Sequence, residues 1–530
     1  MENITFYGGV REIGGNIIDL ETDNARLLFD FGKNFGAESD YFSEFLNPRK
    51  AHGIEDFLEL GLLPDIKGLY RKDYLKHLGK DVQEEPAFDA VFLTHAHMDH
   101  IGYVHFLRSD IPIYCTPTTA TMMDVVQDTG SYTFDEFVEM KESFHLRRKS
   151  RKDELTKFDR DIKSIDRSIY KQRDINTIGN EETVSIGDTE VTCYRVNHSL
   201  PGAAGFHIET PQNCIAYTGD LRLHGYQSHH TENFIEASRN FEPDYLITEG
   251  TNVGNSEEIP PEEKVREKLQ WYIGEENDGV FVNHPRLDLE RMRSVVRAAK
   301  GNDRQYVVRT WQAHMLKELE ENGLLPWDDL SVDSPHIRIL APQKGWGMLM
   351  HKFRTPSGEW KRLDEIDIDD SNHDGLVKKD YRSGWERELV MRDDTVTPLD
   401  ICDNLENYVL YTDYYRLKDL IDLKPERGMY LWSRTEPFNQ EMEIEQRRVH
   451  NWLNHFNLQM RKAHASGHMS QKEIKEMIEE INPSSLLAIH TEKPDWFRKL
   501  TYNQPEIEEG KTIKLASSDI SREEKPVQSN

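Results

Sequence analysis

The sequence predicts an α/β protein built in two parts, and three observations lead to this expectation. Short apolar strands that end in histidine or aspartate occur before residue 250 and again near residue 490. The stretch from about 255 to 455 lacks these strand-end residues and alternates strands with helices, as a parallel sheet does. At 530 residues, with 37% apolar content, the chain can bury at least two sizeable cores.

The highest density of potential metal ligands lies in the run FLTHAHMDHIG, in which the ligands follow the apolar strand at 90–93. A turn that leaves this strand would point side chains outward. Four potential metal ligands stand within six residues: His95, His97, Asp99 and His100. Imidazole binds zinc, iron or manganese, and a neighbouring carboxylate can serve a second ion, so one loop can divide its ligands between two metals. Such crowding disfavours a chance cluster on a solvated turn.

Two metals need more ligands than one loop offers, and later strand ends supply them. These residues are His198 after the strand at 191–196, Asp220 after the strand at 214–218, and His490 after the strand at 485–489. An aspartate that follows a glycine at a strand end can bridge two ions with its two oxygens. Each residue alone would be expected to be a hydrogen-bonded loop residue, but their repeated position favours metal ligands.

The segment HASGHMS offers a second kind of site. A glycine before a helix that begins near residue 470 provides backbone N–H groups and a positive helix end, which together bind anions. His464, Ser466 and His468 would face that anion. A plain helix N-cap by Ser470 is the alternative, and both interpretations can hold together.

Taken in order, eight motifs resemble those of metallo-β-lactamase-fold nucleases of the β-CASP group, and within it the ribonuclease J family. The motifs are FYGGVREIGGN, LLFDFGKNFG, THAHMDHIG, VNHSLPGAAG, YTGDLRLHG, ITEGT, HASGHMS and AIHTE. The resemblance implies a metallo-β-lactamase αββα sandwich with an inserted α/β β-CASP domain. The expected parts are 1–254 for the first part of the metallo-β-lactamase domain, 255–455 for the insertion, 456–510 for the returning part and 511–530 for a polar tail.

The resemblance also assigns roles to individual residues. One zinc would be held by His95, His97 and His198, and a second by Asp99, His100 and His490, with Asp220 shared; manganese is the alternative metal. Asp30 would lie behind the metal loop and orient it. Glu249 would steady His468.

These roles imply a ribonuclease that hydrolyses phosphodiester bonds of single-stranded RNA in RNA processing or decay. Asp99 or Asp220 would orient the attacking water, and His468 would protonate the leaving oxygen or hold the phosphate. RNA is expected over DNA because His490 stands where DNA-processing relatives tend to carry an apolar residue. The choice between 5′–3′ exonuclease and endonuclease action stays open.

Two other functions remain in competition. A small-substrate metallo-hydrolase for esters or thioesters would use the same metal site, but the long insertion and the HASGHMS motif argue against it. A non-catalytic RNA-binding subunit would be expected to have lost metal ligands, and none is missing.

Charge and composition bear on how the protein could bind RNA and on where it is located in the cell. A net charge of −29 opposes polyanion binding, so two metal ions and a few placed basic residues would have to attract RNA. The most basic run, at 145–152, is expected to open a solvated polar helix that continues to about residue 170. The absence of a bilayer-spanning tract or a signal sequence, together with isolated cysteines, favours a cytoplasmic protein. The cysteines are Cys115, Cys193, Cys214 and Cys402.

The remaining expectations concern the insertion and the oligomer. Strands at 279–283, 305–308, 408–411 and 429–432, with a helix at about 287–299, predict a parallel sheet in the insertion. Extra residues at 61–80 and 134–174 are expected near the mouth of a cleft, and 356–394 is expected to be an irregular surface excursion. Arg286, Arg309 and Trp311 follow strand ends and could contact phosphate or a base, although packing roles are favoured. Only 40 residues follow His490, too few for the C-terminal dimerisation domain of bacterial ribonuclease J, so the oligomeric state stays open.

Overall fold

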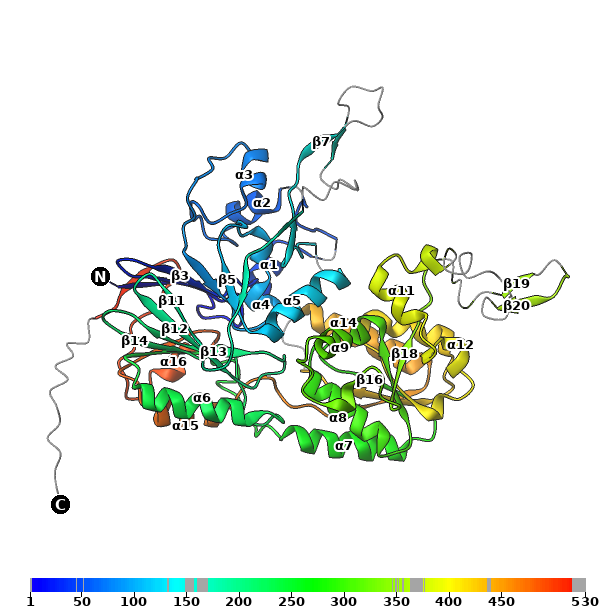
Figure 1. The fold of residues 1–530 in the computed structure, drawn as a ribbon. Helices are drawn as coiled ribbons and strands as arrows, with labels where there is room; N and C mark the ends of the chain where they lie inside the picture. The colour runs from blue at the N-terminus through cyan, green and yellow to red at the C-terminus, as the bar shows by residue number, and fades with distance from the viewer. Residues whose placement is uncertain are drawn as a thin grey trace, which may run out of the picture. The chain divides into compact units, whose positions relative to one another are not determined.

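The computed structural model describes residues 2–516 with short gaps. The residues left out within this range are 44, 51, 131–132, 148–156, 160–169, 346, 348–349, 351, 355–356, 363–374, 376 and 436–439. The chain divides into two compact units (Figure 1). Unit 1 comprises Met1–Leu223, Gln227–Glu258 and His468–Asn530, and unit 2 comprises His224–Tyr226 and Ile259–Gly467.

Unit 1 contains two large sheets. The first has the strand order β10-β5-β4-β3-β2-β1-β26. Its strands are β1 (Asn3–Gly8), β2 (Ile17–Glu21), β3 (Arg26–Phe29), β4 (Ala90–Phe92), β5 (Ile113–Cys115), β10 (Ile175–Thr177) and β26 (Thr512–Lys514). The second has the order β11-β12-β13-β14-β15-β25. Its strands are β11 (Thr183–Ile186), β12 (Thr189–Arg195), β13 (Ala204–Glu209), β14 (Cys214–Tyr217), β15 (Tyr245–Thr248) and β25 (Ser485–Ala488).

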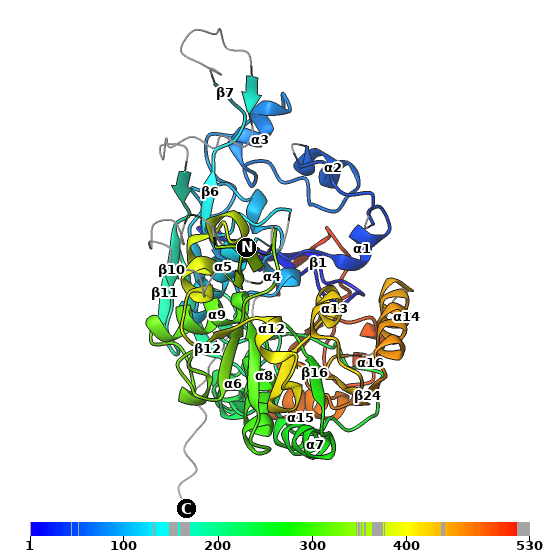
Figure 2. The same cartoon turned by 90° about the vertical axis from the view of Figure 1, so that its right-hand side faces the viewer.

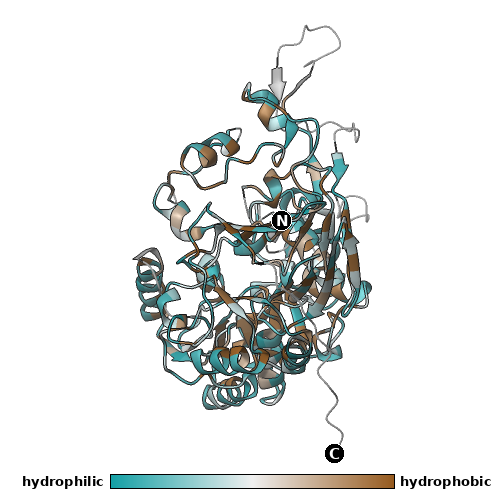
Figure 3. Ribbon diagram, turned by 90° about the vertical axis from the view of Figure 1, so that its left-hand side faces the viewer, coloured by the Kyte–Doolittle hydropathy of each residue, from teal (hydrophilic) through white to brown (hydrophobic). Residues whose placement is uncertain are grey.

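The two sheets of unit 1 enclose an apolar core. Phe29 and Phe92 of the first sheet stack with ring centroids 5.3 Å apart, and Phe92 meets Phe206 of the second sheet at 5.7 Å. Helices α6 (Ser228–Phe241) and α15 (Gln471–Ile481) cover the other face of the second sheet, where they bury Phe234 and Ile478. The inner strands β4 and β15 are buried along their whole length, whereas the edge strands β11 and β26 are partly exposed. Figure 3 shows the corresponding mixture of hydrophobic and hydrophilic segments.

Strand direction explains why residues distant in the sequence can meet. Strands β14, β15 and β25 pair in parallel, and β13 returns antiparallel between β12 and β14. Four strands therefore run in the same direction and end at the same edge of the second sheet. Strands β3 and β4 also pair in parallel, so the residues that follow them share one edge of the first sheet. These edges carry the strand-end histidines and aspartates that were named from the sequence as candidate metal ligands.

The remaining helices of unit 1 are mostly short. They are α1 (Phe35–Ser39), α2 (Gly53–Glu59), α3 (Lys72–His77), α4 (Met98–Ile101), α5 (Pro117–Thr129) and α16 (Pro494–Phe497). The extra segments at 61–80 and 134–174 are joined by Arg71, which is fully buried and pairs with both Asp73 and Glu136. This link ties two insertions of the sequence into one substructure.

The prediction of a helix from about residue 145 to 170 is wrong. In its place the described residues form β7 (His145–Arg147), paired with β8 (Lys157–Asp159), and β6 (Glu139–Lys141), paired with β9 (Tyr170–Gln172). Most of the basic run at 145–152 lies outside the described residues. The polar tail expected from 511 also begins later, because β26 pairs with β1 and Leu515 is buried; residues 517–530 are not described.

Unit 2 is built on the predicted parallel sheet, with strand order β21-β18-β17-β22-β16-β23-β24. Its strands are β16 (Gly279–Asn283), β17 (Gln305–Arg309), β18 (Ile337–Leu340), β21 (Thr395–Val396), β22 (Tyr408–Tyr411), β23 (Gly428–Trp432) and β24 (Leu458–Lys462). The principal helices are α7 (Glu262–Glu275), α8 (Leu289–Lys300), α9 (Thr310–Glu321), α11 (Gly384–Val390) and α14 (Gln440–His455). All its neighbouring strands pair in parallel, which confirms the expected sheet.

One expectation about unit 2 needs correction. The range 356–394 is not wholly an irregular excursion, because α11 lies within it and buries Leu389 and Val390; residues 363–374 are not described. Arg309 is buried and donates to the carbonyl of Tyr411 and to Asp419, which agrees with the packing role favoured from the sequence.

None of the helices in the described ranges is long and apolar enough to cross a membrane. Cys115 and Cys193 are buried as expected, whereas Cys214 and Cys402 are only half-buried.

Candidate metal centre

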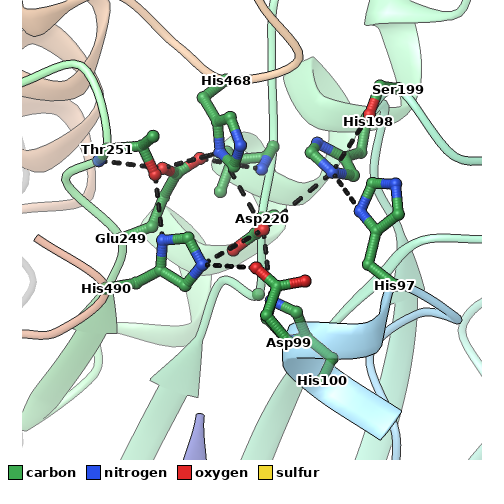
Figure 4. A network of polar contacts seen from close by, with 12 residues as sticks. His97, Asp99, His100, His198, Ser199, Asp220, Glu249, Thr251, His468 and His490 are labelled. Atoms are coloured by element: carbon green, nitrogen blue, oxygen red, sulfur yellow. Dashed lines mark hydrogen bonds and ion pairs between the residues drawn. The ribbon is translucent and has the colours of Figure 1, made fainter. Parts of the chain in front are cut away.

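Histidine and aspartate side chains from both sheets converge in unit 1 (Figure 4). The turn after β4 brings His95 and His97, and the short helix α4 brings Asp99 and His100. The carboxyl edge of the second sheet brings the others: His198 after β12, Asp220 after β14 and His490 after β25. The structure therefore brings together all seven residues that the sequence proposed as ligands.

Three imidazoles form the first donor group: His95, His97 and His198. Nδ1 of His97 lies 2.9 Å from Nε2 of His95 and 3.1 Å from Nε2 of His198. A tetrahedral ion with metal–nitrogen bonds of 2.0–2.1 Å would hold neighbouring nitrogens about 3.3 Å apart. Both distances from Nδ1 of His97 lie within about 0.4 Å of that value.

The second donor group mixes oxygen and nitrogen: Asp99, His100, Asp220 and His490. Nε2 of His490 lies 3.3 Å from Oδ2 of Asp99, and Nε2 of His100 lies 3.2 Å from Oδ2 of Asp220. Oδ2 of Asp220 also lies within 3.9 Å of nitrogen atoms of His95 and His198, so this oxygen touches both groups. The other oxygen of Asp220 is buried and has no hydrogen-bond partner among the described residues. A shared carboxylate with an unsatisfied oxygen suits a bridging ligand.

Backbone strain accompanies this site. Asp30 and His490 adopt left-handed φ angles of 56° and 50°, which cost non-glycine residues about 1 kcal/mol or more. Gly219, before Asp220, has a φ of 56°, and a Cβ there would lie 2.7 Å from the carbonyl oxygen of Ala204. Glycine is therefore required for the turn that aims Asp220 at the cluster.

The histidines of the two donor groups differ in the direction of their pKa shifts. Burial lowers the pKa of His97 to about 4, and burial together with neighbouring imidazoles holds the pKa of His95 and His198 well below the usual value. These imidazoles are consequently neutral at pH 7, the form that binds metals. Burial acts to lower the pKa of His100 and His490, but the charges and hydrogen bonds of the neighbouring aspartates together outweigh it and both pKa values rise. These aspartates are Asp220 and Asp30 for His100, and Asp220 and Asp99 for His490.

Beside the cluster, Glu249 and His468 form a pair in which both Glu249 oxygens lie 2.9 Å from Nδ1 of His468. The carboxylate is itself held by the backbone N–H groups of Leu221 and Thr251. Burial acts to lower the pKa of His468, but the charge and hydrogen bond of Glu249 outweigh it and raise the pKa to about 9. His468 can also be grouped with His198 and Asp220 as a third set of potential ligands.

Behind the metal loop, Asp30 accepts hydrogen bonds from several donors. They are the backbone N–H and hydroxyl of Thr94, Nδ1 of His100 at 2.8 Å and the hydroxyl of Tyr217 at 2.7 Å. A carboxylate only accepts, so the proton of His100 must sit on Nδ1. By the same reasoning, the hydroxyl of Thr94 uses its single proton to donate a hydrogen bond to Asp30. Thr94 Oγ, 3.1 Å from Nδ1 of His95, must then accept a proton from that ring.

This network therefore fixes the tautomer of two proposed ligands. His95 and His100 each carry a proton on Nδ1, so Nε2 is the nitrogen of each ring that faces the cluster and would bind a metal ion. Sequence reasoning found Asp30 but missed Thr94 and Tyr217. The signal was available, since Thr94 stands in THAHMDH and Tyr217 in YTGD, one or three residues before a proposed ligand.

We expect the Thr94→Val substitution to weaken zinc binding about 10- to 100-fold, because the buried Nδ1–H of His95 loses its acceptor. Tyr217→Phe should weaken it less, since Asp30 keeps its other donors. Competition with a chelator would measure the affinity, and ¹⁵N shifts of the histidine rings would report the tautomer. Thr121→Val, on α5 away from the cluster, is the matched control. Unchanged affinity and ring shifts in Thr94→Val would contradict the role.

The residues proposed for phosphate binding fall in different units. His468 belongs to unit 1, whereas His464 and Ser466 belong to unit 2, so their joint site stays a prediction. Within unit 2, fully buried Arg291 makes a two-pronged ion pair with Glu262 and places Nη1 3.1 Å from Nδ1 of His464. Arginine only donates, so Nδ1 of His464 accepts and its proton sits on Nε2, the arrangement that can donate to an anion.

Comparison with known proteins gives independent evidence about the fold and the relatives of the chain. Residues 64–259 match the family described as "Beta-lactamase superfamily domain". The transcription termination factor FttA of Methanothermobacter thermautotrophicus is 27% identical over 271 residues, covering 50% of this chain and 34% of that protein. Ribonuclease J of Corynebacterium glutamicum is 23% identical over 348 residues, covering 63% of this chain and 39% of that protein.

The chain thus spans about a third of the length of the first curated relatives it matches. A crystal structure of a protein of unknown function from Enterococcus faecalis has the same fold over 97% of this chain and 100% of that one, with a TM-score of 0.67 and 21% identity. The α/β fold class predicted from the motifs is confirmed: residues 64–259 belong to a domain of the β-lactamase superfamily, and the chain is similar to ribonuclease J proteins.

Proposed function

We propose that the chain is a metal-dependent ribonuclease that hydrolyses phosphodiester bonds of single-stranded RNA in the cytoplasm. The observation that carries this proposal is the seven-residue donor cluster with the Glu249–His468 pair at its side. Similarity to ribonuclease J and to FttA supports RNA as the substrate class.

We propose zinc as the resident metal, with two ions per chain and manganese as a substitute. His95, His97 and His198 would hold one ion, and Asp99, His100 and His490 the other, with Asp220 shared. Imidazole-rich donors suit zinc, and the two carboxylates of the second group also suit manganese. When bound, such a pair of ions activates water at neutral pH and offsets the charge that develops on phosphate.

The side chains around the cluster would divide the remaining chemistry. Asp99 has 22% of its side chain exposed, so it is the acid that an incoming water can reach and whose oxygens can orient it. Asp220 is almost fully buried, and its Oδ2 lies within 3.9 Å of a nitrogen of each of five histidines: His95, His100, His198, His468 and His490. Because Glu249 engages Nδ1 of His468, Nε2 is the atom that would transfer a proton to the leaving oxygen of RNA.

The decisive assay incubates the purified protein and zinc with end-labelled RNA carrying a 5′ monophosphate, triphosphate or hydroxyl, beside matched DNA. We expect cleavage of RNA and not of DNA. Mononucleotides released only from the monophosphate form would indicate a 5′ exonuclease, and internal fragments an endonuclease. Intact RNA in both zinc and manganese, together with hydrolysis of a thioester, would overturn the proposal in favour of a small-substrate hydrolase.

A further inference from the structure

The turn at residues 249–252 directly follows β15 and packs against the segment that carries His490. The backbone N–H of Gly250 donates to the carbonyl of His490 at 3.3 Å. A Cβ at Gly250 would lie 2.8 Å from ring carbons of the buried Phe497, so the close approach favours glycine. The position of this turn relative to His490 is therefore closely defined.

The side chain of Thr251 contacts the proposed ligand His490 (Figure 4). Its Oγ1 lies 2.9 Å from Nδ1 of the imidazole, while Nε2 of the same ring lies 3.3 Å from Oδ2 of Asp99, within the donor cluster. A neutral imidazole that binds a metal ion through Nε2 carries its proton on Nδ1. The hydroxyl of Thr251 is placed to accept that hydrogen bond, which would orient the ring and strengthen it as a ligand.

The backbone of Thr251 supports the carboxylate that contacts His468. Its N–H donates to Oε2 of Glu249 at 3.2 Å, and the N–H of Leu221 donates to Oε1 at 3.2 Å. Because each carboxylate oxygen has a backbone donor, the direction in which Glu249 meets Nδ1 of His468 is fixed.

The side chain of Asn252 holds the backbone of His468. Its Nδ2 donates to the carbonyl oxygens of His468 and Met469, both at 3.0 Å. An amide NH₂ has two protons, enough to donate one to each carbonyl. The N–H of Met469 donates in turn to the carbonyl of Leu221 at 2.9 Å, so this dipeptide is held from two sides.

The two histidines that this turn contacts come from different segments and stand close together. His468 lies just before α15, and His490 lies between β25 and α16 (Figure 2). Their ring centroids are 5.7 Å apart. Local backbone geometry cannot set this spacing, whereas the adjacent side chains of Thr251 and Asn252 reach one segment each.

We propose that Thr251 and Asn252 are positioning residues with separate roles. Thr251 orients the metal ligand His490, and Asn252 orients the proton donor His468. This inference rests on the proposed function and adds to it the part of the fold that sets these two groups at their working distance. Loss of the hydroxyl would act on metal binding, whereas loss of the amide would act on proton transfer.

Thr251→Val is expected to raise the Kd of the zinc ion held by His490 about 10- to 100-fold, while the other ion keeps its affinity. Thr251→Ser keeps the hydroxyl and should restore both affinities. Competition with a chelator measures the two affinities, and ¹⁵N shifts report the tautomer of His490. Two wild-type affinities in Thr251→Val, or an equal loss in Thr251→Ser, would overturn the role of Thr251.

Asn252→Ala is expected to slow RNA hydrolysis about 100-fold, the effect of misplacing a reacting group by about 1 Å, with both zinc affinities unchanged. Hydrolysis of bis(p-nitrophenyl) phosphate should be unaffected, because its leaving group needs no proton. Asn322→Ala is the matched control, since it removes an amide that donates to the carbonyl of Glu318 at the end of α9. Circular dichroism confirms that the variants fold.

The two substrates decide the role of Asn252. Equal slowing of both substrates in Asn252→Ala, wild-type hydrolysis of RNA, or a loss of zinc would overturn it. Failure of wild type to cleave RNA would instead overturn the proposed function, and the role of Asn252 with it. The zinc measurements on Thr251 would still stand, so the two failures are distinguishable.

Discussion

The Asp220→Asn protein is expected to hydrolyse RNA at least about 10³-fold more slowly than the native protein and to bind fewer than two zinc ions per chain. Oδ2 of Asp220 lies 3.2 Å from His100 and 3.7 Å from His490, and it also reaches the first donor group. An amide has the same shape but loses the negative charge that two cations would share. Loss of transition-state charge stabilisation by a metal is worth several kcal/mol, which corresponds to this rate change.

Elemental analysis of the purified variant gives the zinc-to-protein ratio, and initial rates at saturating zinc give the activity. Asp495→Asn, a substitution at a side chain that is 72% exposed, controls for loss of one surface charge. Circular dichroism confirms that both variants fold. Two zinc ions and a native rate in Asp220→Asn would refute the shared-ligand role.

Substitution of His468 by alanine is expected to reduce RNA hydrolysis about 10²- to 10⁴-fold while zinc content stays unchanged. This range is the usual contribution of a positioned general acid. Glu249→Gln should have a smaller effect, about 10- to 100-fold, because the ring remains but loses the carboxylate that orients Nδ1.

The zinc measurement decides between two roles of His468, since this residue can also be grouped with His198 and Asp220 as a ligand. A fall in zinc content together with activity would make it a ligand and not the proton donor. A substrate with a good leaving group adds a second readout, because it needs no proton and should be cleaved by His468→Ala at close to the native rate. His455→Ala, at an exposed histidine at the end of α14, serves as the control.

The positions of the donor residues could be predicted because they depend on strand ends. Apolar runs at 214–218 and 485–489 correspond to β14 and β25, and each is followed by a proposed ligand. Once these strands run in parallel, Asp220 and His490 must reach the same edge. The parallel sheet of unit 2 could also be predicted, because strands that are buried on both faces appear in the sequence as continuous apolar runs.

Residues whose role depends on distant partners escaped prediction. Thr94 and Tyr217 matter because Asp30 lies between them, a contact that joins β3, β4 and β14. The helix expected at 145–170 failed because charge alone does not specify a helix, and β6 finds its partner β9 about 30 residues later.

The late arrival of β25 has a consequence for biosynthesis. β25 pairs with β15 across the whole of unit 2, and His490 follows it. His490 is synthesised after the whole of unit 2, so a growing polypeptide lacks one of the seven donors until that unit has been made. Under the proposed activity, a nascent chain would therefore be unable to cleave RNA until β25 has been synthesised and has paired with β15.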